Sequence, residues 1–190
     1  MGIGPGALLA LQCVLLMGSH ASPAVSAPQA CPDRERVPEH LRPQNCALAS
    51  ALLSGLSRSA EFRRLSDRIA QLNGAVFIQP GTIVQPAENR ILRGALLHRM
   101  TMVGGHRALF IIVSPDRDDN TLITLAHEFQ HVVEVLQSDA STESEIDALF
   151  LRIGTSVGTI TRETGEAVLV GHRVAQELAR NKNRHSPGDW

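Results

Sequence analysis

The segment Thr121–Gln137 carries the pattern that most restricts how this chain can fold. Its apolar side chains recur at intervals of three and four residues, which is the period of one face of an α-helix. The opposite face carries two histidines and a glutamate. The segment therefore predicts an amphipathic helix with one face suited to a hydrophobic core and a second face suited to chemistry. The apolar positions are Leu122, Leu125, Ala126, Phe129, Val132, Val133 and Leu136.

The segment contains the sequence His127-Glu128-Phe129-Gln130-His131, which is an HExxH motif with both histidines on the polar face. Residues four apart on a helix lie one turn apart on the same face, so the two imidazoles can bind one zinc ion. The glutamate beside the first histidine can reach a water on the metal and act as general base. The motif predicts His127 and His131 as zinc ligands and Glu128 as the catalytic base.

A catalytic zinc site needs a third protein ligand and one open position. Glu134 is on the histidine face, but it starts roughly 10 Å along the helix axis from His127. We therefore expect Glu134 to support the ligands or to form an ion pair. Glu163 and Glu166 are better candidates, since both fall near the start of a predicted last helix. Their spacing does not choose between them, and acidic residues are also common at helix N-termini for electrostatic reasons.

The other segments predict an α+β fold, with a small, mostly antiparallel sheet immediately upstream of the HExxH helix. Helices are expected at 46–56, 60–72, 143–153 and 162–179, and strands at 75–78, 91–103 and 106–113. Thr142-x-x-Glu145 is a capping-box pattern. We expect one domain at 57–180, preceded by a proline-rich arm and short helix at 28–56 and followed by a polar tail at 181–190.

The composition fits one globular domain and argues against some partners. The chain has 190 residues, of which 43% are hydrophobic, and a net charge of −1. Lys and Arg (18) nearly balance Asp and Glu (19), so nothing indicates a nucleic-acid partner. There is no tyrosine, so a phenol cannot stabilise an oxyanion here.

The N-terminus predicts a signal peptide. The apolar run 7–18 is too short to cross a bilayer, which takes about 20 helical residues. Small residues follow it and offer cleavage sites after Ala21 or, less favourably because Pro28 comes next, after Ala27. A buried core helix is the alternative. We expect a secreted or periplasmic protein that has no stable membrane insertion once the signal peptide is removed.

Cysteine usage agrees with export. Cleavage removes Cys13 and leaves Cys31 and Cys46, an even pair that predicts one disulfide. Such a bridge would close a loop of about 15 residues and stabilise the fold by about 3 kcal/mol. Two free buried thiols are the alternative.

The HExxH helix, followed some thirty residues later by a glutamate on another helix, resembles the glutamate-type zincins, or gluzincins. The segment Leu125–Glu134, the pair Glu163-Thr164 and the pattern Gly171-x-x-Val174-x-x-Glu177-Leu178 are similar to small exported bacterial proteins of minimal-zincin type. That resemblance covers about 57–180. It implies His127 and His131 as ligands, Glu163 as the third ligand, Glu128 as base, and an upstream edge strand along which an extended substrate lies.

The chain departs from zincin peptidases in two respects. It lacks a tyrosine for the oxyanion, which leaves a set of histidines and arginines as substitutes, and it is too short for a second lobe that would wall a cleft. The substitutes are His98, His106, His172, Arg162 and Arg173.

Two functions follow from these observations. The first is an exported zinc-dependent hydrolase acting on a peptide or protein substrate, with Zn²⁺ as cofactor and Glu128 as base. The second is an exported zinc-binding structural or binding domain with vestigial or no catalysis. The pattern makes no prediction of oligomeric state.

Overall fold

The computed structural model describes residues 31–85, 89–116, 119–157 and 161–185. The predicted signal peptide, with its cleavage sites after Ala21 or Ala27, lies outside these residues. None of the helices in the described part is long and apolar enough to cross a membrane.

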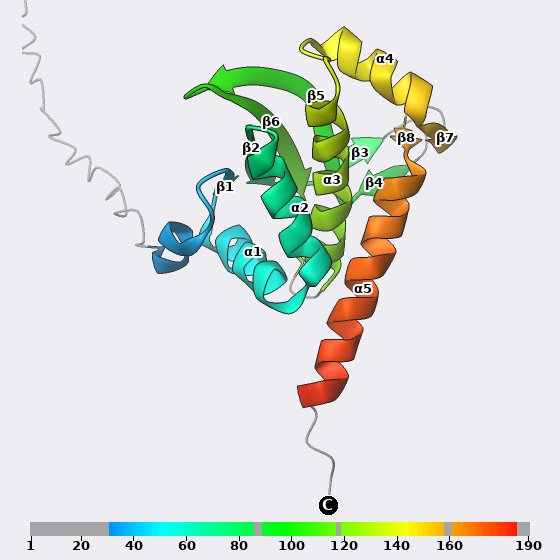
Figure 1. Ribbon diagram of the computed structural model, residues 1–190. Coiled ribbons are helices and arrows are strands. Elements are labelled where there is room, and N and C mark those ends of the chain that lie inside the picture. The colour runs from blue at the N-terminus through cyan, green and yellow to red at the C-terminus, as the bar shows by residue number, and fades with distance from the viewer. Residues whose placement is uncertain (1–30, 86–88, 117–118, 158–160, 186–190) are drawn as a thin grey trace, which may run out of the picture. The chain divides into compact units, whose positions relative to one another are not determined.

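A four-stranded sheet forms one layer of the fold, with the strand order β1-β2-β6-β5 (Figure 1). Its strands are β1 (Leu41–Pro43), β2 (Gly74–Pro80), β5 (Gly94–Val103) and β6 (His106–Val113). β2 pairs in parallel with both β1 and β6, whereas β5 pairs antiparallel to β6. The α+β class is confirmed, but the prediction of a mostly antiparallel sheet is wrong for this sheet. β1 reaches β2 through two helices, the kind of crossover connection that parallel neighbours require.

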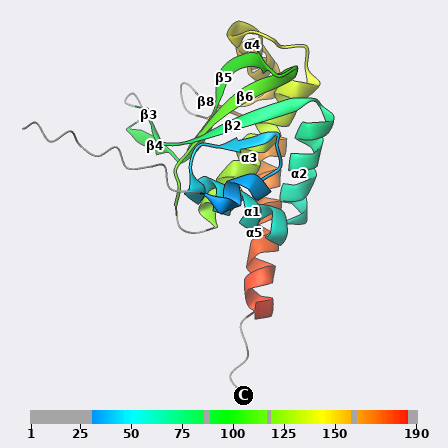
Figure 2. The same ribbon diagram turned by 90° about the vertical axis from the view of Figure 1, so that its left-hand side faces the viewer.

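Helices cover one face of the sheet (Figure 2). α1 (Cys46–Arg58), α2 (Ala60–Gln71) and α3 (Asn120–Gln137) all contact the sheet, and α5 (Gly165–His185) packs mainly against α3. α4 (Glu143–Ile153) packs against β5. The HExxH segment is therefore the central helix of the fold, with the sheet on one side and α5 on another.

The apolar stripe of α3 is buried as predicted. All seven of its apolar positions belong to the hydrophobic core, and Phe129 packs against Phe62 of α2 with ring centroids 5.3 Å apart. Val76 and Ile78 of β2 and Leu109 of β6 complete this part of the core. Because the core holds α3 on several sides, its position relative to the sheet is fixed by packing.

The segment before α1 is more ordered than an extended arm. It contains a 3-10 helix, η1 (Pro32–Arg36), and then β1, which joins the edge of the sheet. Cys31 and Cys46 form the predicted disulfide, with Cα atoms 5.6 Å apart. β1 has only three residues, of which Leu41 and Pro43 are buried and Arg42 is exposed, and its Pro43 is tolerated because the strand is at an edge.

Two short hairpins complete the fold: β3 (Ile83–Gln85) with β4 (Arg90–Leu92), and β7 (Thr155–Val157) with β8 (Thr161–Glu163). The second hairpin changes the predicted end of the chain. The last helix begins at Gly165, not near 162, and continues to His185, so much of the predicted polar tail is helical. Thr164 caps this helix by accepting a hydrogen bond from Ala167 N at 3.2 Å.

Candidate metal centre

Glu163 meets the two histidines of the HExxH motif from a different element. His127 and His131 lie one turn apart on α3, and Glu163 is the last residue of β8. Glu163 Oε2 is 2.7 Å from His127 Nε2 and 3.5 Å from His131 Nε2. One ligand atom from each residue lies within 4.8 Å of the other two. The three predicted ligands therefore form a group that could hold a metal ion, and no second such group occurs among the described residues.

Glu166, the alternative third ligand, lies outside this group. Its side chain is about half exposed on α5, and its Oε1 accepts a hydrogen bond at 2.9 Å from Arg173, which lies about two helical turns further along α5. The geometry therefore favours Glu163 as the third ligand. Glu163 does not lie on the predicted last helix, however. Glu163 ends a strand, and the β7–β8 pairing of Thr155 with Glu163 sets where its carboxylate lies.

Glu134 supports His131, as the sequence predicted. Glu134 Oε2 lies 2.9 Å from His131 Nδ1, and the hydroxyl of Thr164 donates to Glu134 Oε1 at 2.7 Å. Gln130 also donates to Oε1, at 3.3 Å. A carboxylate on the second nitrogen of an imidazole fixes the ring and leaves the other nitrogen free to bind a metal. Here that arrangement leaves His131 Nε2 facing Glu163.

Opposite charges hold the metal-free group together. Burial alone would raise the pKa of the Glu163 carboxyl, but its close interactions with His127 and His131 outweigh burial and hold this pKa at about 2. Burial would likewise lower the pKa of His131, but Glu134 and Glu163 raise it to about 10. A bound divalent cation would take the place of the imidazolium proton as the positive charge beside these carboxylates.

The group fits a zinc ion in chemistry and in size. Glu163 Oε2 is buried, and no N–H or O–H group points at it in hydrogen-bond geometry, even though His127 Nε2 is 2.7 Å away. Buried polar atoms rarely lack a partner, and a metal ion would supply one. Two imidazole nitrogens with one carboxylate oxygen form a zinc ligand set with a fourth position open. Zinc bonds of about 2.0–2.2 Å require ligand atoms about 3–3.5 Å apart. Glu163 Oε2 is 2.7 and 3.5 Å from the two imidazole nitrogens, and all three ligand atoms lie within 4.8 Å, so small side-chain movements would bring them to zinc-binding distances.

Glu128 lies between the metal-binding group and the edge of the sheet. Its side chain is buried, and its Oε2 accepts a hydrogen bond of 2.8 Å from the backbone N–H of Leu96 in β5. Burial raises the pKa of the Glu128 carboxyl above its ordinary value, despite the opposing effect of His131 and His127. A carboxyl with a raised pKa beside a metal site is suited to accept and return a proton near neutral pH.

A cavity of about 110 Å³ joins these groups to solvent. It combines the carboxylates and His131 of the candidate centre with apolar and cationic side chains from β5, α4 and β8. The cavity is lined by Leu92, Gly94, Ala95, Leu96, His98, Glu128, His131, Phe150, Arg162 and Glu163.

Two of the five substitutes for the missing tyrosine reach this cavity, namely His98 and Arg162. The other three are elsewhere. Arg173 pairs with Glu166 and with a glutamate of α2, and His106 and His172 are exposed on β6 and α5. The tertiary structure therefore reduces five sequence candidates to two.

Four partners of the site were not predicted from the sequence, and three of them had a weak local signal. Thr164 directly follows Glu163, and Asp147 and Phe150 lie three residues apart on one face of a predicted helix. The fourth is the Leu96 N–H. An edge-strand backbone group has no signature in the sequence beyond the strand itself.

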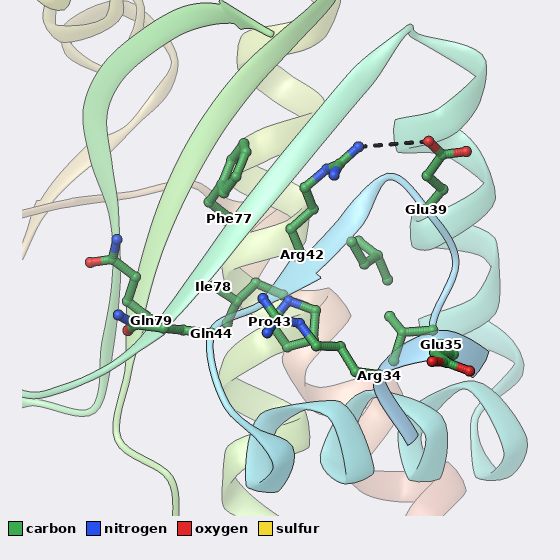
Figure 3. Close-up of a pocket in the computed structure, with 11 residues that line it drawn as sticks. Arg34, Glu35, Glu39, Arg42, Pro43, Gln44, Phe77, Ile78 and Gln79 are labelled. Atoms are coloured by element: carbon green, nitrogen blue, oxygen red, sulfur yellow. Dashed lines mark ion pairs between the residues drawn. The ribbon is translucent and has the colours of Figure 1, made fainter. Parts of the chain in front are cut away.

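A larger cavity of about 560 Å³ lies at the other edge of the sheet, over β1 and β2 (Figure 3). Figure 3 shows Arg42 directed toward Glu39, and these two form an ion pair of 3.8 Å in which Glu39 is 95% exposed. The charged side chains around this cavity are solvated, and it shares no lining residue with the candidate metal centre. The smaller cavity is the one that brings buried titratable groups together.

Comparison of the chain with known protein families, curated proteins and solved structures found no match.

Proposed function

We propose that the protein is an exported zinc-dependent hydrolase that cleaves peptide bonds. The observation that carries this proposal is the convergence of His127, His131 and Glu163 beside the buried carboxylate of Glu128. Three ligands with an open fourth position are typical of catalytic zinc, whereas structural zinc sites are closed by four protein ligands.

Zinc, when bound by these three residues, lowers the pKa of a water molecule and polarises the substrate carbonyl. Glu128 accepts a proton from the attacking water as its oxygen bonds to the carbonyl carbon. Glu128 then returns this proton to the leaving nitrogen as the carbon–nitrogen bond breaks, so that one water is consumed and an acid and an amine are released. The raised pKa of Glu128 suits both steps.

The end strand β5 supports a peptide as the substrate. β5 pairs with β6 on one side only within the described sheet, and its backbone at Leu96 faces Glu128. An extended peptide can add to the free edge of such a strand through backbone hydrogen bonds, which brings its carbonyl groups past the site. The absence of a side chain at Gly94 lets the strand approach α3 closely, because a Cβ there would lie 2.4 Å from Thr124 Cγ2.

Export has support from the N-terminal part of the described chain. The Cys31–Cys46 disulfide is the kind of bond that persists in oxidising compartments outside the cytosol. We propose a secreted or periplasmic location on this ground and on the predicted signal peptide.

An exported zinc-binding domain with little or no catalysis is the second candidate. The observation in its favour is the small size of the cavity, about 110 Å³, compared with about 300–1,000 Å³ for ordinary ligand sites. In this function the metal would hold α3 and β8 together.

Metal analysis and one substitution test both functions. Protein purified at neutral pH without chelator should contain one equivalent of zinc, or take it up on addition. Glu128→Gln should retain the zinc and lose hydrolysis of a broad peptide library, with Glu166→Gln as a control that keeps both. A protein that does not bind zinc contradicts both functions. A zinc-loaded wild type that cleaves none of the library supports the second.

A further inference from the structure

His98 is held in an unusual position on the edge strand. The register between β5 and β6 is interrupted between Leu97 and Met100, so His98 and Arg99 have no partner in β6. The guanidinium of Arg99 lies 4.4 Å from the centre of the Phe110 ring, whereas His98 lines the cavity beside the metal-binding group. β-Bulges often occur next to active sites, where the extra residues redirect a side chain.

Two side chains of α4 fix the His98 ring. Asp147 Oδ1 is in hydrogen-bonding contact with His98 Nδ1, and the ring stacks on Phe150 with centroids 5.1 Å apart and planes 17° apart. A carboxylate can only accept, so His98 Nδ1 is the donor in this contact. The other ring nitrogen, Nε2, does not take part in the contact with Asp147. Nε2 can donate as well in the form of the ring that carries a hydrogen on both nitrogens.

The same Phe150 ring links His98 to the candidate centre. Its ring is also perpendicular to the His131 ring, with centroids 5.2 Å apart and planes at 89°, so Phe150 packs against both imidazoles. His98 also lies two residues after Leu96, whose N–H binds Glu128. One short stretch of β5 therefore contacts the base and lines the cavity where a substrate carbonyl would be attacked.

The geometry points to His98 as the hydrogen-bond donor to the carbonyl oxygen of the cleaved peptide bond, with Asp147 as its positioning residue. This inference rests on the proposed hydrolase function. The oxygen gains negative charge as water adds, and a donor already fixed in place stabilises that charge with little reorganisation. Arg162 also lines the cavity. His98, however, is clamped between the Asp147 carboxylate and the Phe150 ring, which fix its position.

Peptide phosphonamidates test this inference without relying on turnover, because their tetrahedral anionic phosphoryl group resembles the charged state. Peptide hydroxamates with the same side chains bind zinc but do not carry that group. His98→Phe keeps a ring against Phe150 and removes both nitrogens, and Asp147→Asn removes the charge that orients the ring. His98→Gln is the second variant at the same position. Arg162→Gln and the exposed His172→Phe are the matched controls.

We expect zinc-loaded His98→Phe to bind phosphonamidates about 10- to 100-fold more weakly than wild type, with hydroxamate affinity and zinc content unchanged. Asp147→Asn should show a smaller loss of the same kind, and where cleavage is measurable both variants should lower kcat more than they change KM. His172→Phe should match wild type.

Three results overturn the inference while leaving the hydrolase proposal intact: equal phosphonamidate binding by both His98 variants and wild type, a selective loss in Arg162→Gln instead, or loss of zinc from both His98 variants. A zinc-loaded wild type that binds no phosphonamidate in a panel with apolar, acidic and basic side chains contradicts the hydrolase proposal and this inference together.

Discussion

The hydroxyl of Thr164 donates a hydrogen bond of 2.7 Å to Glu134, and this contact joins the start of α5 to the last turn of α3. The other oxygen of Glu134 holds His131 Nδ1 at 2.9 Å. Thr164 directly follows Glu163 in the chain. The Glu134 carboxylate thus orients the ring of His131 and, through Thr164, restrains the position of Glu163.

Removing that carboxylate should weaken metal binding without removing a ligand. We expect Glu134→Gln to lower zinc affinity about 10- to 100-fold, the range found when a partner of a metal-bound imidazole is lost. Thr164→Val should lower it less, because His131 keeps its own hydrogen bond. Competition with a chromogenic chelator measures both. Unchanged affinity in Glu134→Gln would show that the His131 ring is held by packing alone.

Glu163 and Glu166 should differ sharply in their effect on zinc. Glu163→Gln places a neutral amide beside His127 and removes the only carboxylate of the candidate ligand group, so we expect its zinc affinity to fall by at least about 100-fold. Glu166→Gln breaks only an exposed ion pair with Arg173 and should bind zinc as wild type does. Equal affinity in the two variants would exclude Glu163 as a ligand. The measurement is zinc titration against a competing chelator at constant pH.

Gly94 should tolerate alanine only if space is made for it. The new methyl group would lie 2.4 Å from Thr124 Cγ2, so we expect Gly94→Ala to lower the free energy of unfolding by about 1–3 kcal/mol. Thr124→Ser removes that methyl group, and the double variant should recover most of the loss. Urea denaturation of the four proteins gives the coupling between the two sites. Additive losses would mean that the contact is not the cause.

The capping box of α4 should make stability depend on acid pH. Hydrogen bonds from Ser141 and Thr142 lower the pKa of Glu145 from 4.5 to about 2. A depressed pKa means that the folded state favours the carboxylate. Its contribution is therefore present above about pH 4.5 and is lost as pH falls toward 2.

Glu145→Gln tests this dependence. The difference in urea midpoint between wild type and Glu145→Gln should be larger at about pH 6 than at about pH 2.5. Glu143→Gln, which removes another carboxylate from the first turn of α4, is the control. A difference that does not change with pH would contradict the role of the charge. Since α4 carries Asp147 and Phe150, the same variant should also disturb the His98 clamp.

Features that depend on spacing along one helix could be predicted from the sequence. The apolar stripe of α3, the shared face of His127 and His131, and the supporting place of Glu134 all follow from the rise and turn of an α-helix. The capping box of α4 is equally local, and its Thr142 and Glu145 hydrogen bonds are both present. These predictions are confirmed because they need no knowledge of what the helix packs against.

Features that depend on pairing between distant segments could not be predicted from the sequence. β1 has only three residues, too few for their alternation to identify a strand, so its parallel pairing with β2 was not predictable from its pattern. Glu163 was expected near the start of the last helix, yet pairing with β7 makes it the end of a strand. The clamp of Asp147 on His98 joins residues 49 apart in the chain.

The sequence by itself determined that one helix presents two imidazoles and a glutamate on the face opposite a core stripe, because helical geometry repeats along the chain wherever it forms. Only the tertiary structure decided that Glu163 and not Glu166 faces those imidazoles, and that His98 and Arg162 remain of five oxyanion candidates. Those choices depend on which surfaces are buried against one another. Residues three apart, such as Glu163 and Glu166, differ in surroundings only once the β7–β8 hairpin and α5 have packed beside α3.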